Sequence, residues 1–172
     1  MGIHPWDAAS ADISTMQRRS DGIQAIGEIG LDFASAVPKE IQYSAFRSQL
    51  AIAQQRGLPV VLHCVRAFNE VMLLLKETPP PIVIFHGFIG SVQQAAQALR
   101  QGYYLSFGLR TFSSPRTQEV LRTMPLDRLF LETDDADISI EEIYEKTAHL
   151  RQISIVELQQ NIQINYERIF RK

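Results

Sequence analysis

The chain has 172 residues, of which 45% are hydrophobic, 21% charged and 9% aromatic, and its formal net charge is −2. This composition excludes collagen-like, low-complexity and disordered classes. The near balance of charge excludes a global basic field, so nucleic-acid binding would need a local cluster or a metal. The single cysteine excludes an internal disulfide framework, and no apolar run is long enough to span a membrane. We therefore expect a cytoplasmic protein with no membrane partner.

Short apolar runs alternate with amphipathic stretches along the chain, which predicts βαβ units, an α/β fold and a parallel sheet. Most of these runs lack polar alternation, as expected of strands buried on both faces. A stub at residues 2–6 is interpreted as the tail end of a further strand. The five predicted strands span residues 23–29, 59–64, 82–88, 103–107 and 128–132.

Helices are predicted between the strands from their end signals. Pro38 suits the first position of a helix, and Gly57 suits its C-terminal cap. After the last strand, Ser139 and Ser154 each precede a glutamate three residues later, a capping-box pattern that predicts two consecutive C-terminal helices. No linker or repeat divides the sequence, so we expect a single domain over residues 1–172.

Polar residues lie at the ends of four apolar strands, at the edge where open α/β sheets and barrels place their sites. Glu28, His63 and His86 belong to the first three strands, and Asp134 follows the fifth. Such groups are unfavourable there unless they are paired, hydrogen-bonded or bound to a metal. Each residue alone has a structural alternative, but together two imidazoles and two carboxylates suit a hydrolytic divalent metal such as Zn, Mn, Ni or Mg.

Six segments resemble those of the TatD-related metal-dependent hydrolases, a branch of the amidohydrolase-like barrels. They occur in the family's order at residues 2–6 (GIHPW), 27–32 (GEIGLD), 63–66 (HCVR), 86–91 (HGFIGS), 131–134 (LETD) and 165–170 (NYERIF). The resemblance implies a (β/α)8 TIM-barrel-like fold with one or two divalent metal ions per chain. It also implies a deoxyribonuclease that hydrolyses the phosphodiester bonds of DNA.

The resemblance implies roles for the strand-end residues. Glu28 resembles a ligand that can bridge two metals, and His63 and His86 resemble the imidazole ligands of one of them. Asp134 resembles a ligand of the other metal and the base that takes a proton from the attacking water. Glu28 and Asp134 are therefore the candidate catalytic residues, and all four are candidate metal ligands.

Three further residues are candidates for substrate binding. Arg66 follows the second strand, where a guanidinium can contact a phosphate oxygen bidentately, although a solvated arginine opening a helix is the alternative. Arg110 follows the fourth strand and has a similar alternative. His4 lies in the family's Gly-x-His-Pro segment, where facing the substrate and packing both remain open.

Two neighbours of these candidates are assigned other roles. Asp32 is interpreted as fixing the loop that follows Glu28 rather than contacting the chemistry. Cys64 follows His63 directly, so alternation points it to the opposite face of its strand and disfavours a nucleophilic role.

Two features depart from the family's pattern. The family begins with a strand ending in a His-x-His pair that supplies two metal ligands, whereas this sequence starts downstream of where that pair is expected. A complete barrel usually needs about 250 residues, so we expect a barrel that is incomplete at its N-terminus. Members of the family often have a longer, proline-containing stretch after this aspartate, whereas here Asp134 is followed almost directly by the Ser139 cap. The substrates of relatives therefore say less about the substrate of this chain.

We therefore expect a metal-dependent hydrolase acting on ester bonds of DNA, impaired in this chain for lack of the His-x-His ligands. A small-molecule phosphoesterase or amidohydrolase is one alternative, because a fold does not fix its substrate. The other is a non-catalytic truncated remnant that self-associates through exposed sheet edges.

Overall fold

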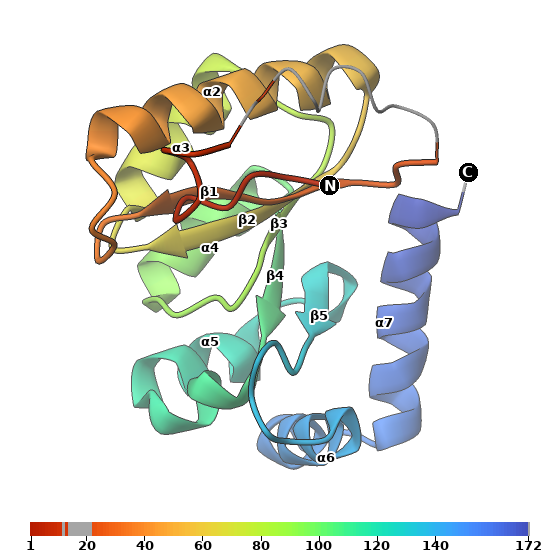
Figure 1. Cartoon of the computed structure of the whole chain (residues 1–172). Coiled ribbons are helices and arrows are strands. Elements are labelled where there is room, and N and C mark those ends of the chain that lie inside the picture. The colour runs from red at the N-terminus through yellow and green to blue at the C-terminus, as the bar shows by residue number, and fades with distance from the viewer. Residues whose placement is uncertain (12, 14–21, 172) are drawn as a thin grey trace. The chain divides into compact units, whose positions relative to one another are not determined.

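The computed structural model describes residues 1–11, 13 and 22–171. It contains two compact units, Met1–Ile84 and Phe85–Lys172. The first unit holds β1 (Ile26–Asp32), α2 (Lys39–Arg56), β2 (Val60–Val65), α3 (Phe68–Glu77) and the start of β3 (Val83–Phe85). The second holds the end of β3, α4 (Val92–Arg100), β4 (Tyr104–Phe107), η1 (Leu109–Ser113), α5 (Pro115–Thr123), η2 (Leu126–Arg128), β5 (Leu129–Leu131), α6 (Ile140–Arg151) and α7 (Ile155–Phe170) (Figure 1).

All five predicted strands are present, and the first is displaced along the chain. It was predicted over residues 23–29, whereas β1 is Ile26–Asp32. The strand does not end at the glycines around Glu28, because it stays paired with β2 as far as Asp32 opposite Val65. Glu28 therefore lies inside β1, and Asp32 takes the place at its carboxyl end.

β1 and β2 are parallel neighbours with one irregularity in register. Ile26 pairs with Val60 and Ile29 with Leu62, so β1 carries one extra residue between these pairs, which is a β-bulge. Beyond the bulge, side chains alternate between the two faces of the strand. Ile29 is fully buried on one face, and Glu28 belongs to the other, which leaves that face for polar chemistry.

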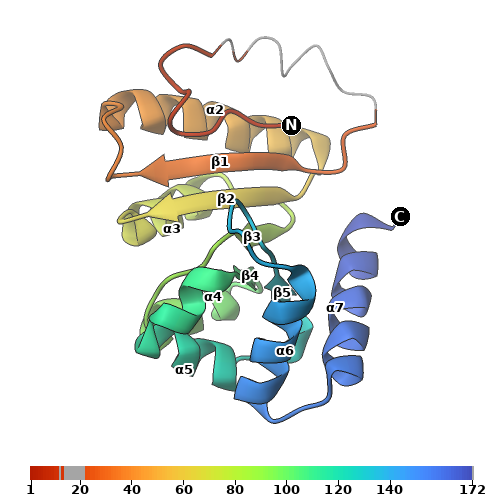
Figure 2. The same cartoon turned by 60° about the horizontal axis from the view of Figure 1, so that its bottom comes forward.

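α2 lies along β1 in both views of the first unit (Figures 1 and 2). Its C-terminal end is as predicted, at Gly57, whose φ of 64° is the left-handed conformation that glycine adopts readily. Its N-terminal end is one residue later than predicted, because Pro38 is the N-cap and not the first helical residue. Phe46 and Leu50 are fully buried on its inner face. The helix therefore supplies apolar cover for this part of the sheet.

Two buried glutamines of α2 form hydrogen bonds with backbone groups outside the helix. Gln42 donates from Nε2 to the carbonyls of Asp32 (2.9 Å) and Val37 (2.8 Å), and its Oε1 accepts the Asp32 amide at 2.7 Å. Gln49 accepts the Ile3 amide at 2.6 Å and donates to the Ile3 carbonyl at 3.0 Å. Because buried backbone groups need partners, these amides fix the end of β1 and the N-terminal segment in place.

The predicted strand tail at residues 2–6 is wrong, because this segment forms no strand. It nevertheless runs beside β1: the Gly27 amide donates to the Met1 carbonyl at 3.2 Å. A Cβ on Gly2 would lie 2.7 Å from the Gly27 carbonyl carbon, so only glycine permits this approach. Gln49 takes the Ile3 backbone groups that a strand ladder would use, and the segment then turns.

In the second unit, β4 and β5 are parallel neighbours, with Leu105 opposite Leu129 and Phe107 opposite Leu131. The two consecutive C-terminal helices are present as predicted. Ser139 precedes α6 and Ser154 precedes α7, and each serine oxygen accepts an amide from the first turn of its helix. No helix among the described residues is long and apolar enough to cross a membrane.

Gly30 is the position in β1 where a side chain is least tolerated. Its φ is 141°, and a Cβ there would lie 2.0 Å from the His63 carbonyl oxygen. Gly30→Ala is expected to lower the free energy of unfolding by about 1–3 kcal/mol, measured by urea denaturation. Gly102→Ala is the matched control, because Gly102 also has a positive φ of 78° but no neighbour within 4 Å. Equal losses in the two variants would contradict the close approach of β1 to β2.

Candidate metal centre

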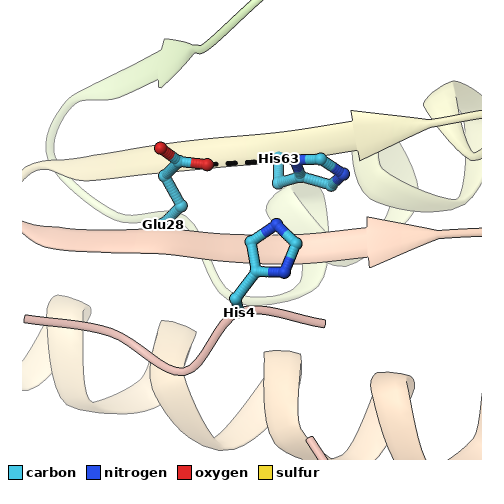
Figure 3. A group of neighbouring side chains, drawn as sticks. All are labelled: His4, Glu28 and His63. Atoms are coloured by element: carbon cyan, nitrogen blue, oxygen red, sulfur yellow. Dashed lines mark ion pairs between the residues drawn. The ribbon is translucent and has the colours of Figure 1, made fainter. Parts of the chain in front are cut away.

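Glu28 and His63 face each other across β1 and β2 in the first unit (Figure 3). His63 Nδ1 lies 3.8 Å from Glu28 Oε2. Gly30 is the register partner of His63, so the strand carries no side chain directly beside the imidazole. His4 reaches the same place from the N-terminal segment, with its ring centroid 4.3 Å from that of His63. One ligand atom from each of the three residues lies within 4.8 Å of the others.

Asp32 determines which nitrogen of His63 carries a proton. His63 Nε2 lies 3.2 Å from Asp32 Oδ2. An ionised carboxylate only accepts hydrogen bonds, so Nε2 is the donor. In the neutral ring Nδ1 then carries the lone pair, on the side of Glu28. Metal-binding histidines are commonly arranged in this way: one ring nitrogen donates a hydrogen bond to a carboxylate, and the other faces the metal site.

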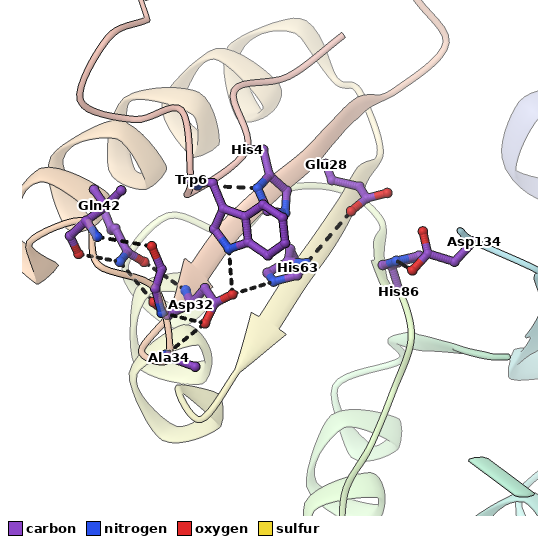
Figure 4. A network of polar contacts seen from close by, with 11 residues as sticks. His4, Trp6, Glu28, Asp32, Ala34, Gln42, His63, His86 and Asp134 are labelled. Carbon is purple, nitrogen blue, oxygen red and sulfur yellow. Dashed lines mark hydrogen bonds and ion pairs between the residues drawn. The ribbon is translucent and has the colours of Figure 1, made fainter. Parts of the chain in front are cut away.

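Each oxygen of the Asp32 carboxylate accepts two hydrogen bonds (Figure 4). Oδ1 accepts the amides of Ala34 (2.8 Å) and Ser35 (3.2 Å), and Oδ2 accepts Trp6 Nε1 (2.7 Å) besides His63. Burial raises the pKa of Asp32, but the hydrogen bonds from Trp6, Ala34 and His63 outweigh burial and hold the pKa below its ordinary value. The interpretation that Asp32 fixes the loop is confirmed, and its contact with His63 is an addition.

His4 is suited to donate a hydrogen bond from Nε2. Burial, and after it the neighbouring His63, lower the pKa of His4 more than the nearby carboxylates raise it, which favours the neutral imidazole. His4 Nδ1 accepts the Trp6 amide at 3.3 Å, so in the neutral ring Nε2 carries the proton. This arrangement fits a group that contacts a substrate oxygen better than it fits a metal ligand.

His86 in the second unit has carboxylates at both ring nitrogens. It follows β3 directly, and its Nδ1 lies 2.9 Å from Glu132 Oε1. Its Nε2 lies 3.5 Å from Asp134 Oδ2 (Figure 4). In the neutral ring, the shorter contact favours the proton on Nδ1, which leaves Nε2 as the lone-pair nitrogen, on the side of Asp134. The second unit therefore repeats the pattern that Asp32, His63 and Glu28 form in the first.

The surroundings of Glu132 leave its carboxylate little freedom. Ser106 of β4 donates a hydrogen bond from Oγ to Glu132 Oε2. A Cβ on Gly108 would lie 3.4 Å from Glu132 Cγ, and one on Gly87 would lie 3.5 Å from Oε1. The side chain of Glu132 is 17% exposed, whereas that of Asp134 is 48% exposed. Glu132 is thus held in place beside His86, whereas Asp134 is open to solvent.

The structure brings the candidates together in two sets. Glu28, His63 and His4 meet in the first unit, and His86 and Asp134 meet in the second. The candidate substrate-binding arginines are both exposed, one in each unit. Arg66 directly follows β2, and Arg110 lies in η1 after β4.

Asp32 and Glu132 contact the two histidines, a role that the sequence did not predict for either residue: Asp32 was assigned to the loop alone, and Glu132 was not a candidate. Asp32 shares the face of Glu28 four residues later along β1, and Glu132 stands directly after the apolar strand β5. Both signals are present in the sequence. They identify carboxylates at the sheet edge, but not which carboxylate supports a histidine and which meets a metal.

Comparisons with known proteins agree with this geometry. The profile of the TatD related DNase family matches residues 1–171. The metal-dependent hydrolase YabD of Bacillus subtilis is 31% identical over 194 residues, covering 99% of this chain and 76% of that protein. The 3'-5' ssDNA/RNA exonuclease TatD of Dickeya dadantii is 35% identical over 164 residues, covering 87% of this chain and 61% of its own length.

A solved structure extends the likeness to the backbone. The crystal structure of YjjV, a TatD homologue from Escherichia coli, matches with a TM-score of 0.89 and 28% identity, covering 100% of this chain and 76% of that one. The α/β, TIM-barrel-like fold class is thereby confirmed. The chain belongs to the TatD-related DNase family, and at the level of that family the expectation of a metal-dependent hydrolase acting on ester bonds is confirmed.

Cys64 is placed as predicted, away from the chemistry. Burial raises the pKa of its thiol to about 12. Because the thiolate is the reactive form, we expect Cys64 to react with a disulfide reagent at pH 8 far more slowly in the native protein than in urea. Rapid stoichiometric labelling of the native protein would contradict the partly buried position of Cys64 and the raised pKa of its thiol.

Asp32→Asn tests the supporting role of the carboxylate. The NH2 group of asparagine is a donor and can accept a hydrogen bond from neither Trp6 nor His63. We therefore expect a loss of about 2 kcal/mol in unfolding free energy at pH 7 without metal. A lowered pKa means that the carboxylate stabilises the fold above its unfolded-state value of about 3.9 and loses this effect as the pH falls below about 4. The gap between variant and wild type should therefore narrow toward pH 2. Asp127→Asn is the control, because the Asp127 side chain is 55% exposed.

Proposed function

We propose that this chain is a divalent-metal-dependent hydrolase that cleaves phosphodiester bonds of nucleic acid, DNA in the first place. The observation that carries the proposal is the repeated arrangement of a histidine between a supporting and a ligating carboxylate. The names of the relatives, a metal-dependent hydrolase and a 3'-5' ssDNA/RNA exonuclease, support the reaction and the substrate.

The donor set fits a divalent metal. Within the first unit, Glu28 Oε2 and His63 Nδ1 would be the metal ligands. Within the second unit, His86 Nε2 and Asp134 Oδ2 would be the metal ligands. Mixed imidazole and carboxylate ligands suit Zn, Mn, Ni or Mg ions that keep a position open for water. A bound divalent ion lowers the pKa of water and polarises a phosphoryl oxygen.

The remaining residues of the proposed site handle protons and charge. Asp134 is exposed enough to reach solvent and is proposed as the base that accepts the proton of the attacking water. His4 is proposed to donate a hydrogen bond from Nε2 to a phosphate oxygen. Arg66 and Arg110 are proposed to contact the phosphate backbone as planar cations.

Metal content tests the ligand assignment. Protein purified without chelators is expected to carry metal in elemental mass spectrometry, and Glu28→Gln is expected to lose most of it, because the amide is a weaker ligand than the carboxylate. Glu141→Gln, an exposed change in the first turn of α6, should keep it. Equal metal content in Glu28→Gln and wild type would remove Glu28 from the ligand set. A metal-free wild type that sediments as an oligomer would favour the self-associating alternative.

Cleavage assays test the reaction and the substrate class. Single-stranded and duplex oligonucleotides and a panel of chromogenic phosphoesters would be incubated with Mn²⁺, Mg²⁺ or Zn²⁺ and with EDTA. We expect metal-dependent cleavage of oligonucleotides that falls about 100-fold or more in Asp134→Asn, which removes the base. His149→Ala on the exposed side of α6 is the matched control. Turnover of small phosphoesters without nucleic-acid cleavage would replace the proposed substrate.

A further inference from the structure

Trp6 combines a large exposed surface with a rigid attachment. It is the single tryptophan of the chain, and it is 61% exposed. Its Nε1 donates to Asp32 at 2.7 Å. Its ring meets His4 edge-on, with centroids 4.8 Å apart and planes at 84°. The polar edge of the indole is therefore anchored, while much of its apolar surface remains in water.

The backbone that carries Trp6 is also fixed. Its own amide donates to His4 Nδ1, and the following amide of Asp7 donates to the His4 carbonyl at 2.9 Å. Ile3, three residues earlier, is buried and held by Gln49. Exposed surface that is already ordered loses little conformational entropy when a ligand covers it.

A hollow of about 330 Å³ lies beside Trp6. It is lined by Trp6, Asp32 and the short side chains of Ala34, Ser35 and Ala36. This volume is at the lower end of ligand sites, and the small residues leave an aromatic ring as the main apolar wall. The hollow therefore suits one planar group laid against the indole.

The hollow is close to the proposed chemistry within the same unit. The Trp6 and His63 ring centroids are 6.1 Å apart, and both residues bond to the same Asp32 oxygen (Figure 4). A planar group on Trp6 would thus be next to a phosphate contacted by His4 or by a metal on His63. In a nucleic acid, the planar group that the sugar links to a phosphate is a base.

We propose that Trp6 is a stacking platform for a single unpaired base of the substrate, an inference that rests on the proposed function. Stacking on an indole requires that the base be unpaired, so the site selects single-stranded ends over continuous duplex. It accepts any base, because every base has a π face and none of the described residues that line the hollow provides a full set of hydrogen-bond partners for one base.

The fluorescence of Trp6 reports stacking directly, because no other tryptophan contributes. Short oligo(dT), added to the metal-free protein in EDTA, is expected to quench the emission in a saturable way. An oligonucleotide of the same length with abasic sugars throughout is expected to quench little. No quenching by oligo(dT), or equal quenching by both, would overturn the inference. Metal-dependent cleavage is measured separately, so its absence would reject the proposed function without altering this result.

Substitutions separate stacking from support of Asp32. By anisotropy of a labelled single-stranded oligonucleotide in EDTA, Trp6→Leu is expected to weaken binding about tenfold. Trp6→Phe keeps a ring but no N–H group, and it should keep most of the affinity. Leu73→Ala is the control, because Leu73 on α3 is also 61% exposed. Wild-type binding by Trp6→Leu would overturn the inference, and so would Trp6→Phe binding as weakly as Trp6→Leu, since the N–H group would then be the relevant contact.

Discussion

The hydrogen bond from a histidine to a supporting carboxylate is the interaction on which the rest of the site depends. It occurs twice, between His63 and Asp32 and between His86 and Glu132. In each case the carboxylate fixes the tautomer, and the other nitrogen meets a more exposed carboxylate. Without this bond the proton could move to the other ring nitrogen, which would remove the lone pair that the proposed metal needs.

Much of the surrounding structure keeps these supporting carboxylates in place. Gln42 holds the backbone of Asp32 at the end of β1, while Trp6 holds its side chain. Ser106 donates to Glu132, which also lies against two glycines. Trp6 therefore has two roles. Its N–H group donates a hydrogen bond to Asp32, and its exposed ring is the proposed contact for a base.

The sequence predicts the fold class, all five strands and the types of the site residues, because strand-end polar residues and helix caps are local signals. The end of β1 was misplaced because a bulge and the pairing of Gly30 with His63 extend the strand past two glycines. The stub was mistaken for a strand because its partner, Gln49, lies 46 residues away in the sequence. The roles of Asp32 and Glu132 also depend on contacts between residues far apart in the sequence, namely which ring nitrogen of His63 or His86 each carboxylate contacts.

The most direct test of this account is the tautomer of each histidine, measured by long-range ¹H–¹⁵N correlation on ¹⁵N-histidine protein at pH 8. Ordinary imidazoles are neutral at that pH, and the four histidines can be assigned by single substitution. We expect the Nε2–H form for His63 and the Nδ1–H form for His86, with Zn²⁺ shifting the resonance of the other nitrogen in each ring. Opposite tautomers, or Zn²⁺ shifts at neither ring, would contradict it.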